Sequence, residues 1–294
     1  MDFKQIEAFV NVVRYKSFSK AADATFFTQP TISAHIQNLE KELDVKLLNR
    51  NGRSVEMTTQ GSKFYKYAIE MINARSAALN AMGAGEDSVS GILEIQTSSI
   101  PAVTFLPDLL ADFRKEHKEI KYYVSVSDTE TVVDNIIDRR GELGFIGDKV
   151  VSSAIESTKI AQDKTVMIAP KSFGLSGNIS LDKASELPFI WRETGSATRK
   201  TFEAAAVAHG LDKTSFEVAA LFNDIDSIVR AVESGLGVAV ISENIASRLG
   251  DRVSALNIDD FGEERSFYLI KLKNASLSPT AEAFYQYIAT IQFP

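Results

Sequence analysis

The fold of the N-terminal region is decided by residues 28–43, which read TQPTISAHIQNLEKEL. Thr28 is a favourable helix N-cap, and Pro30 falls in the first turn, where its missing N–H removes no helical hydrogen bond. Apolar residues recur at helical spacing from Ile32 to Leu43 and give this helix one buried face. The opposite face begins with short, uncharged side chains, so the helix can approach another surface closely.

Two helices are expected before this stretch and a hairpin after it. The first covers residues 2–15 and starts at a capping box formed by Asp2 and Gln5. The hairpin covers residues 44–57 and turns at Asn51-Gly52, because both residues tolerate positive φ. This order is typical of a winged helix-turn-helix, in which one helix enters the major groove of DNA.

The residues expected to contact DNA lie at the start of the third helix and on the hairpin, or wing. Short side chains let the helix backbone approach base edges, glutamines can bridge to bases, and arginines on the wing can reach phosphates or the minor groove. The set is Thr28, Gln29, Pro30, Thr31, Ser33, Gln37, Arg50 and Arg53. The alternative interpretation is a three-helix bundle whose polar face is merely solvated.

A long helix is expected over residues 59–82, followed by a Gly/Ser-rich linker. Its apolar stripe has heptad-like spacing, and a rod of this length usually needs a partner to cover such a stripe. We therefore expect a self-associating helix and a homodimer or homotetramer. The stripe consists of Phe64, Ala68, Met71, Ala78 and Met82.

From residue 91 onward, strand and helix patterns alternate, which favours an α/β domain with largely parallel sheets. The strands are expected at 92–97, 120–126, 143–147, 165–169, 217–221, 238–241 and 266–272. The helices are expected at 102–117, 129–140, 198–209, 224–234 and 279–291.

The composition is that of an ordinary globular protein with an uneven charge distribution. The 294 residues carry a net charge of −7 and no cysteine. Residues 1–90 hold 11 Lys/Arg and 10 Asp/Glu, so the head is nearly neutral and the body is acidic. A DNA-binding face needs local rather than overall positive charge, so DNA remains a possible partner. No signal peptide and no apolar run of about 18 residues is found, so we expect a cytoplasmic protein that contacts no membrane.

Enzymatic chemistry has little support in the sequence. The three histidines, His35, His117 and His209, fall on separate expected helices. Neither HExxH, nor a Walker loop, nor Gly-x-Ser-x-Gly is present. We therefore expect no catalytic residue, no metal ligand and no cofactor.

Several motifs closely resemble the head of the LysR-type transcriptional regulators. These motifs are Ser17-Phe18-Ser19-Lys20-Ala21-Ala22, Thr28-Gln29-Pro30-Thr31-Ile32-Ser33, Leu39-Glu40-x-x-Leu43, Leu47-x-x-Arg50 and Thr58-x-x-Gly61. Gly141-x-Leu143-Gly144-Phe145 and Gly235-Leu236-Gly237-Val238-Ala239 look like that family's effector domain. The resemblance covers nearly the whole chain.

The resemblance implies a ligand-responsive transcriptional regulator that binds a double-stranded DNA operator. Its body would have two α/β subdomains joined by two crossover strands, like a periplasmic solute-binding protein. The expected division is 1–58 for the winged helix-turn-helix, 59–90 for the linker helix and hinge, and 91–294 for the effector domain. Within the last, subdomain I would be 91–162 with 266–294, and subdomain II would be 163–265.

The expected effector site lies in the cleft between these subdomains. Ligands of α/β sheets bind beyond the carboxyl ends of strands, often against helix N-termini. The candidates are Ser98, Ser99, Ile100, Ser127, Thr129, Gly147, Thr194, Ser196, Thr198 and Asn223. Ordinary helix capping is the alternative reason for such residues.

Hydroxyls and helix N-termini suit a small anion or carboxylate, with Arg192 or Arg199 as the counter-charge. If Asp128 and Asp148 face the cleft, a polar neutral or amine-bearing ligand, such as an amino-acid derivative, is the alternative. Two rival functions stay open: an enzyme of the solute-binding fold class with an added head, and an assembly protein that binds no DNA.

Overall fold

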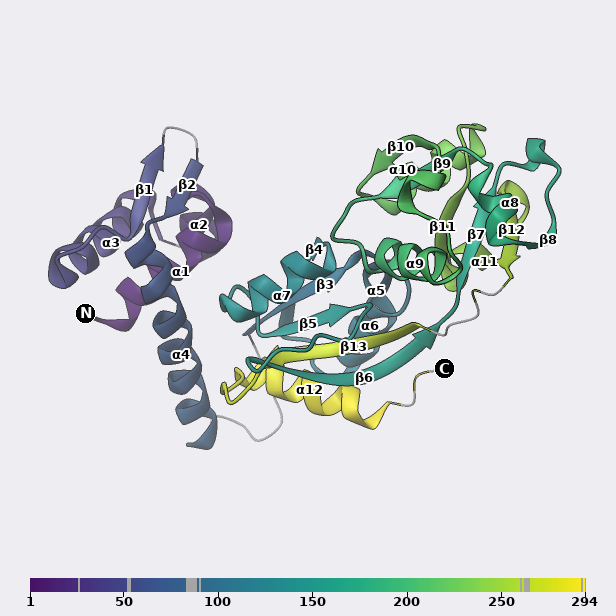
Figure 1. Ribbon diagram of the computed structural model, residues 1–294. Helices are drawn as coiled ribbons and strands as arrows, with labels where there is room; N and C mark the ends of the chain where they lie inside the picture. The colour runs from purple at the N-terminus through teal and green to yellow at the C-terminus, as the bar shows by residue number, and fades with distance from the viewer. Residues whose placement is uncertain are drawn as a thin grey trace. The chain divides into compact units, whose positions relative to one another are not determined.

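The computed structural model describes residues 1–25, 27–51, 54–82, 89, 91–259, 261, 265–291 and 293. The chain divides into two compact units, Met1–Val89 with Asn274–Glu282, and Ser90–Lys273 with Ala283–Pro294. Figure 1 shows the helices and strands of each unit.

The first unit contains the expected three helices, hairpin and long helix. Asp2 forms the capping box with Gln5, and the Thr28 hydroxyl accepts a hydrogen bond from the Thr31 backbone N–H. The elements are α1 (Phe3–Tyr15), α2 (Phe18–Thr25), α3 (Gln29–Leu43), β1 (Leu48–Asn51), β2 (Ser54–Met57) and α4 (Thr59–Ala81). The predicted winged helix-turn-helix architecture is therefore confirmed.

The apolar face of α3 forms the centre of this unit's core. Ile32, Ile36 and Leu39 are completely buried against α1 and α2. Phe9 of α1 is also fully buried, and its ring centroid lies 5.5 Å from that of Phe64 of α4. The core thus fixes the orientation of α3 and leaves its polar face outward.

The heptad-like stripe of α4 is only partly available to a partner, which corrects the sequence interpretation. Phe64, Ala68 and Met71 pack against the core of their own unit. Ala78 and Met82 are exposed, and Leu79, which the stripe did not include, is 50% exposed. The half of α4 nearest the hairpin therefore belongs to the head, and the far half carries the exposed apolar side chains.

The second unit has two lobes, each built on a sheet. In the first lobe the strand order is β4-β3-β5-β13-β6. The strands are β3 (Gly91–Ser98), β4 (Ile120–Ser127), β5 (Leu143–Ile146), β6 (Ile155–Asp163) and β13 (Arg265–Leu272). The helices are α5 (Ser99–Val103), α6 (Leu106–Glu116), α7 (Thr129–Ile137) and the part of α12 (Pro279–Thr290) from Ala283 onward.

Helices cover both faces of this sheet, so its central strand β5 is buried throughout. Phe145 faces α12, where its ring centroid lies 6.4 Å from that of Phe284. The next residue, Ile146, faces α7 and packs with Val132 and Ile136. This alternation is the two-residue period of a strand, and two covered faces explain its continuous apolar sequence.

The second lobe has a four-stranded sheet, β11-β7-β12-β8, and a two-stranded sheet, β10-β9. The strands are β7 (Thr165–Ala169), β8 (Gly177–Ile179), β9 (Phe189–Arg192), β10 (Val218–Phe222), β11 (Ala239–Ser242) and β12 (Ser254–Ile258). The helices are α8 (Leu181–Ser185), α9 (Ala197–Ala208), α10 (Ile225–Glu233) and α11 (Glu243–Leu249), with short 3₁₀ turns η1 (Lys171–Phe173), η2 (Lys213–Ser215) and η3 (Gly250–Arg252).

Two expectations about this body are wrong in detail. The sheets are mixed rather than largely parallel, because β13 runs antiparallel to both β5 and β6, and β7 runs antiparallel to β11 and β12. The helix expected over 102–117 is split at Thr104. Pro107 lies in the first turn of α6, where its missing N–H is tolerated, whereas in the middle of a continuous helix it would break a hydrogen bond.

Within the described ranges, no helix is both long enough and apolar enough to cross a membrane.

Candidate functional site

The first candidate site is the outward face of α3. Gln29, Pro30 and Gln37 are exposed, and Ser33 is half-buried. The hydroxyl oxygen of Thr28 lies 2.8 Å from that of Thr31, one helical turn further along. The N-terminal half of α3 therefore presents a compact surface without charge.

A buried carboxylate joins the end of α3 to the wing. Glu40 is 6% exposed, and its Oε1 accepts hydrogen bonds from the backbone N–H groups of Leu47 at 2.9 Å and Leu48 at 3.2 Å. Its Oε2 lies 2.6 Å from the Lys46 ammonium. Burial alone would raise the pKa of Glu40, but Lys46 and the two N–H groups lower it below its ordinary value. The carboxylate is therefore ionised at neutral pH and fixes the start of β1.

The wing itself is the β1–β2 hairpin, in which Asn51 pairs with Ser54. Arg50 lies on β1, but its side chain is outside the described residues, as is the whole of Arg53. Their expected contact with DNA remains a prediction.

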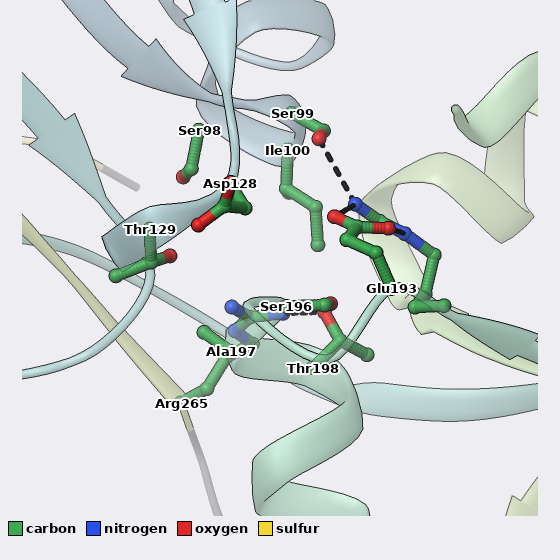
Figure 2. Close-up of a pocket in the computed structure, with 11 residues that line it drawn as sticks. Ser98, Ser99, Ile100, Asp128, Thr129, Glu193, Ser196, Ala197, Thr198 and Arg265 are labelled. Carbon is green, nitrogen blue, oxygen red and sulfur yellow. Dashed lines mark hydrogen bonds and ion pairs between the residues drawn. The ribbon is translucent and has the colours of Figure 1, made fainter. Parts of the chain in front are cut away.

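The second candidate site is a pocket between the two lobes of the second unit, with an empty volume of about 220 Å³ (Figure 2). That volume includes space open to solvent, so the enclosed part of the pocket is smaller and suits a small ligand. Most of its lining residues are polar or charged, although apolar atoms also contribute to its surface. The lining comprises Ser98, Ser99, Ile100, Asp128, Thr129, Arg192, Glu193, Ser196, Ala197, Thr198 and Arg265.

Strand ends and helix starts from both lobes bring these side chains together. Ser98 ends β3 and Ser99 begins α5. Asp128 caps α7 and accepts from the Thr131 N–H at 3.0 Å. Ser196 caps α9 from the other lobe. The pocket thus lies against the N-termini of helices from both lobes, where backbone N–H groups give partial positive charge.

Arg265 enters the pocket from the first residue of β13 and is 6% exposed. Its Nη1 donates to the Thr198 hydroxyl at 2.6 Å, and its Nη2 donates to the Gly147 carbonyl at 3.1 Å. A Cβ on Gly147 would lie 2.1 Å from Nη2, so this close approach requires glycine. Burial lowers the pKa of Arg265 to about 10, which leaves it cationic at neutral pH.

Arg192 is the second buried cation of the pocket. Its Nε and Nη2 donate to the two carboxylate oxygens of Glu193 at 2.9 and 2.7 Å. Its Nη2 also donates to the Ser99 hydroxyl of the other lobe at 3.0 Å. The ion pair of Lys200 with Glu130 also joins the two lobes, as does the hydrogen bond from Arg265 to Thr198.

The pocket brings together six of the ten expected effector residues. The six are Ser98, Ser99, Ile100, Thr129, Ser196 and Thr198. The other four, Ser127, Gly147, Thr194 and Asn223, are not among its lining residues. Gly147 does not line the pocket, but its carbonyl accepts a hydrogen bond from Arg265, which does. Effector contact by all ten remains a prediction.

Five lining residues were not in the expected set: Asp128, Arg192, Glu193, Ala197 and Arg265. Arg192 was considered as a counter-charge together with Arg199. Arg199 instead donates to Glu203 at 2.7 Å and stacks over Trp191, with its guanidinium carbon 5.1 Å from the ring centroid. The sequence around Arg265 does not indicate that this residue is buried. Arg265 reaches the pocket because its strand, β13, pairs with β5 and β6.

Among the described residues, no group of three or more His, Cys, Asp or Glu side chains could hold a metal ion.

Two family models match the chain and together cover most of it. Residues 3–62 match the helix-turn-helix of bacterial regulatory proteins of the lysR family. Residues 86–291 match the LysR substrate binding domain.

Curated relatives extend over the same length. An uncharacterized HTH-type transcriptional regulator of Methanocaldococcus jannaschii is 27% identical over 97% of this chain and 97% of its own. A probable RuBisCO transcriptional regulator of Cyanophora paradoxa is 33% identical over 77% of this chain and 71% of its own. Among solved structures, full-length OxyR from Pseudomonas aeruginosa superposes with a TM-score of 0.73 at 16% identity, covering 98% of this chain and 96% of its own.

Proposed function

Because the chain belongs to the LysR family of bacterial helix-turn-helix regulators, we propose that α3 reads a DNA operator and that the interlobe pocket binds the controlling effector. The observation that carries the effector assignment is the convergence of hydroxyls and two buried arginines from both lobes on one pocket.

The surface of α3 supports base reading at its N-terminal half. A helix fits the major groove, and its first residues reach base edges. Short side chains at Thr31 and Ser33 permit close approach, and Gln29 and Gln37 supply amide groups for bases. The proposed DNA-contacting set is Thr28, Gln29, Pro30, Thr31, Ser33, Gln37, Arg50 and Arg53.

Control by the effector would be a population shift between arrangements of the two lobes. A ligand changes such an equilibrium only by its difference in affinity for the two states. Groups from both lobes line the pocket, so a bound molecule that contacts both favours the arrangement in which they are close. Assembly of two or more copies through α4 would convert that change into a different spacing of the heads on DNA.

We propose the following division of labour. Residues 1–58 read DNA, residues 59–90 join and self-associate, and residues 91–294 bind the effector, through subdomain I (91–162 and 266–294) and subdomain II (163–265). The curated relatives named above are transcriptional regulators, and we propose that this chain likewise regulates transcription rather than catalysing a reaction. We also propose that it works in the cytoplasm, because a regulator that reads DNA must reach the genome.

A combined binding experiment tests this function. Full-length protein is screened for thermal stabilisation by organic acids, sugar phosphates and amino acids, and each hit is added to a gel shift with DNA from upstream of its own gene. A true effector at about 100 times its dissociation constant stabilises the native state by about 2.7 kcal/mol and changes the gel shift.

Replacing Ser98 with Ala and Thr129 with Val should weaken effector binding by roughly tenfold, so that about ten times more effector is needed for the same response, and should leave DNA binding intact. These two positions are preferable to Ser99 and Thr198, whose hydroxyls accept hydrogen bonds from buried arginines. A response identical to that of the wild type would place the effector elsewhere.

A further inference from the structure

We propose that the ligand of the interlobe pocket is a small anion whose negatively charged oxygens accept a hydrogen bond from the Nε of Arg265 and from the hydroxyls of Ser98 and Thr129. This inference rests on the proposed function only in taking the pocket to be a ligand site.

The first argument is the incomplete hydrogen bonding of Arg265. Its two terminal nitrogens are bound to Thr198 and Gly147, but its Nε has no hydrogen-bond partner in the described part of the chain. Within the same residues, no carboxylate lies within 4 Å of its guanidinium; the ring of Phe267 lies below it, 5.0 Å from the guanidinium carbon. Burial lowers the pKa of Arg265, and the charges of Asp163 and Asp148 raise it, so the cation has carboxylates nearby but no direct ion pair. What remains unmet is the buried Nε donor, and a buried N–H without an acceptor is costly.

The second argument is that the carboxylates of the pocket are already engaged. The two oxygens of Asp128 accept from the backbone N–H and the hydroxyl of Thr131 at 3.0 and 2.6 Å. Both oxygens of Glu193 accept from Arg192. A cationic ligand would have to compete for these oxygens, whereas an anion finds donors that protein groups have left open.

The third argument concerns the remaining donors. Ser98 and Thr129 are 6% and 9% exposed. The Ser98 hydroxyl makes no capping bond to α5, and among the described residues neither hydroxyl is hydrogen-bonded to a protein group. Thr129 is the first residue of α7, a helix of nine residues, and Ala197 is the first of α9, with twelve. Both residues line the pocket, so the positive ends of both helices favour the same anion.

The fourth argument concerns size and competition. The empty volume of about 220 Å³ includes space open to solvent, so the enclosed part of the pocket is smaller and favours a small ion over a large ring system. Glu193 competes with a bound anion for Arg192, because its carboxylate already forms an ion pair with that arginine in the pocket. An anion that binds beside Glu193 is repelled by it, so removing that charge should strengthen anion binding.

Titrations of the full-length protein with sodium sulfate, sodium phosphate, sodium acetate and sodium malonate test the inference. Calorimetry and thermal unfolding are compared with sodium chloride at equal ionic strength. At least one of the four should bind saturably and stabilise the protein, and the ranking separates oxyanions from carboxylates. If all four match chloride, the inference is wrong.

Variants link that binding to the pocket. Arg265→Gln should weaken it by about ten- to a hundredfold, as expected for loss of a charge-assisted hydrogen bond. Ser98→Ala with Thr129→Val should weaken it by roughly tenfold without disturbing the buried arginine. Glu193→Gln should strengthen it by about tenfold. The matched control is Glu203→Gln, which removes the carboxylate paired with Arg199 outside the pocket and should change nothing.

The two proposals fail in different ways. An anion that binds through Arg265 without altering the gel shift overturns effector control and leaves this inference intact. A neutral or zwitterionic molecule that alters the gel shift, is lost on Ser98→Ala with Thr129→Val and is unaffected by Arg265→Gln overturns this inference and leaves the proposed function intact.

Discussion

At the residue scale, the ionised carboxylate of Glu40 is expected to stabilise the head in a pH-dependent way. Its folded pKa is lowered, so its contribution is present above the ordinary carboxyl value and is lost as the pH falls through the folded pKa. Glu40→Gln should therefore cost about 1–3 kcal/mol at pH 7 and much less near pH 3. Urea unfolding at both pH values measures this.

The exposed Glu56 of β2 provides the control, since Glu56→Gln should leave the unfolding free energy unchanged at either pH. An equal loss in Glu40→Gln at pH 7 and pH 3 would show that packing, not charge, is responsible.

Individual residues also show which members of the pocket lining can be predicted from the sequence. Ser98, Thr129 and Ser196 were found because a hydroxyl between a strand and a helix is a local signal. Arg265 was missed because its burial depends on β13 pairing with β5 and β6, which are more than 100 residues away in the chain. Glu193 was missed because an Arg-Glu pair in sequence is usually solvated, and only the pocket gives it a role.

At the scale of elements, α3 is expected to tolerate no bulky side chain on its DNA-facing surface. Ser33→Arg should weaken specific operator binding by at least about tenfold, because the longer side chain blocks close approach to base edges. A gel shift measures the change, and circular dichroism checks the fold. Asn38→Arg adds the same residue at an exposed position further along α3 and should retain operator binding. Wild-type affinity in Ser33→Arg would contradict the assignment of α3.

The exposed half of α4 is expected to carry the self-association. Leu79→Glu with Met82→Glu should raise the dimer dissociation constant by about tenfold or more, because the seam would bury charge. Sedimentation velocity at micromolar concentration measures it, and Lys63→Glu at an exposed position near the head is the control. A monomeric wild type would refute the prediction. Phe64→Glu would be uninformative, because Phe64 packs in the head's own core.

Elements with a strong period were predicted well, whereas some short or polar strands, namely β6, β8, β9 and β12, were not expected. α1, α3 and α10 each carry a clear apolar stripe and were expected close to their observed bounds. β9 has only four residues, and β6 is a half-exposed strand of mixed polarity, IESTKIAQD, so neither gave a period-two signal. Their identity as strands comes from long-range pairing that a local pattern does not contain.

At the scale of the whole molecule, contacts between the lobes should tune ligand affinity from outside the pocket. Arg248 of α11 donates to the carbonyls of Val103 and Thr104 in the other lobe at 2.8 and 3.2 Å. Arg248→Ala should lower affinity for the pocket's anion by up to about tenfold, because the binding-competent arrangement becomes less populated.

Calorimetry with the best of the four anions measures that affinity. Arg230→Ala, which breaks an ion pair with Glu233 on the same lobe, is the control and should have no effect. If the two variants behave alike, the interlobe contacts do not govern binding.

The place of β13 in the first sheet has a consequence for synthesis on the ribosome. β13 lies between β5 and β6, yet it is the last strand of the chain to be made. Until residues 265–272 emerge, β5 and β6 each expose an unpaired edge, while every strand of the second lobe is already available. The second lobe should therefore fold first during translation, and the nascent first lobe should be the part most dependent on chaperones. Arrested nascent chains in which residue 262 is followed by a linker long enough to bring it out of the exit tunnel should yield a protease-resistant second lobe and a protease-sensitive first lobe.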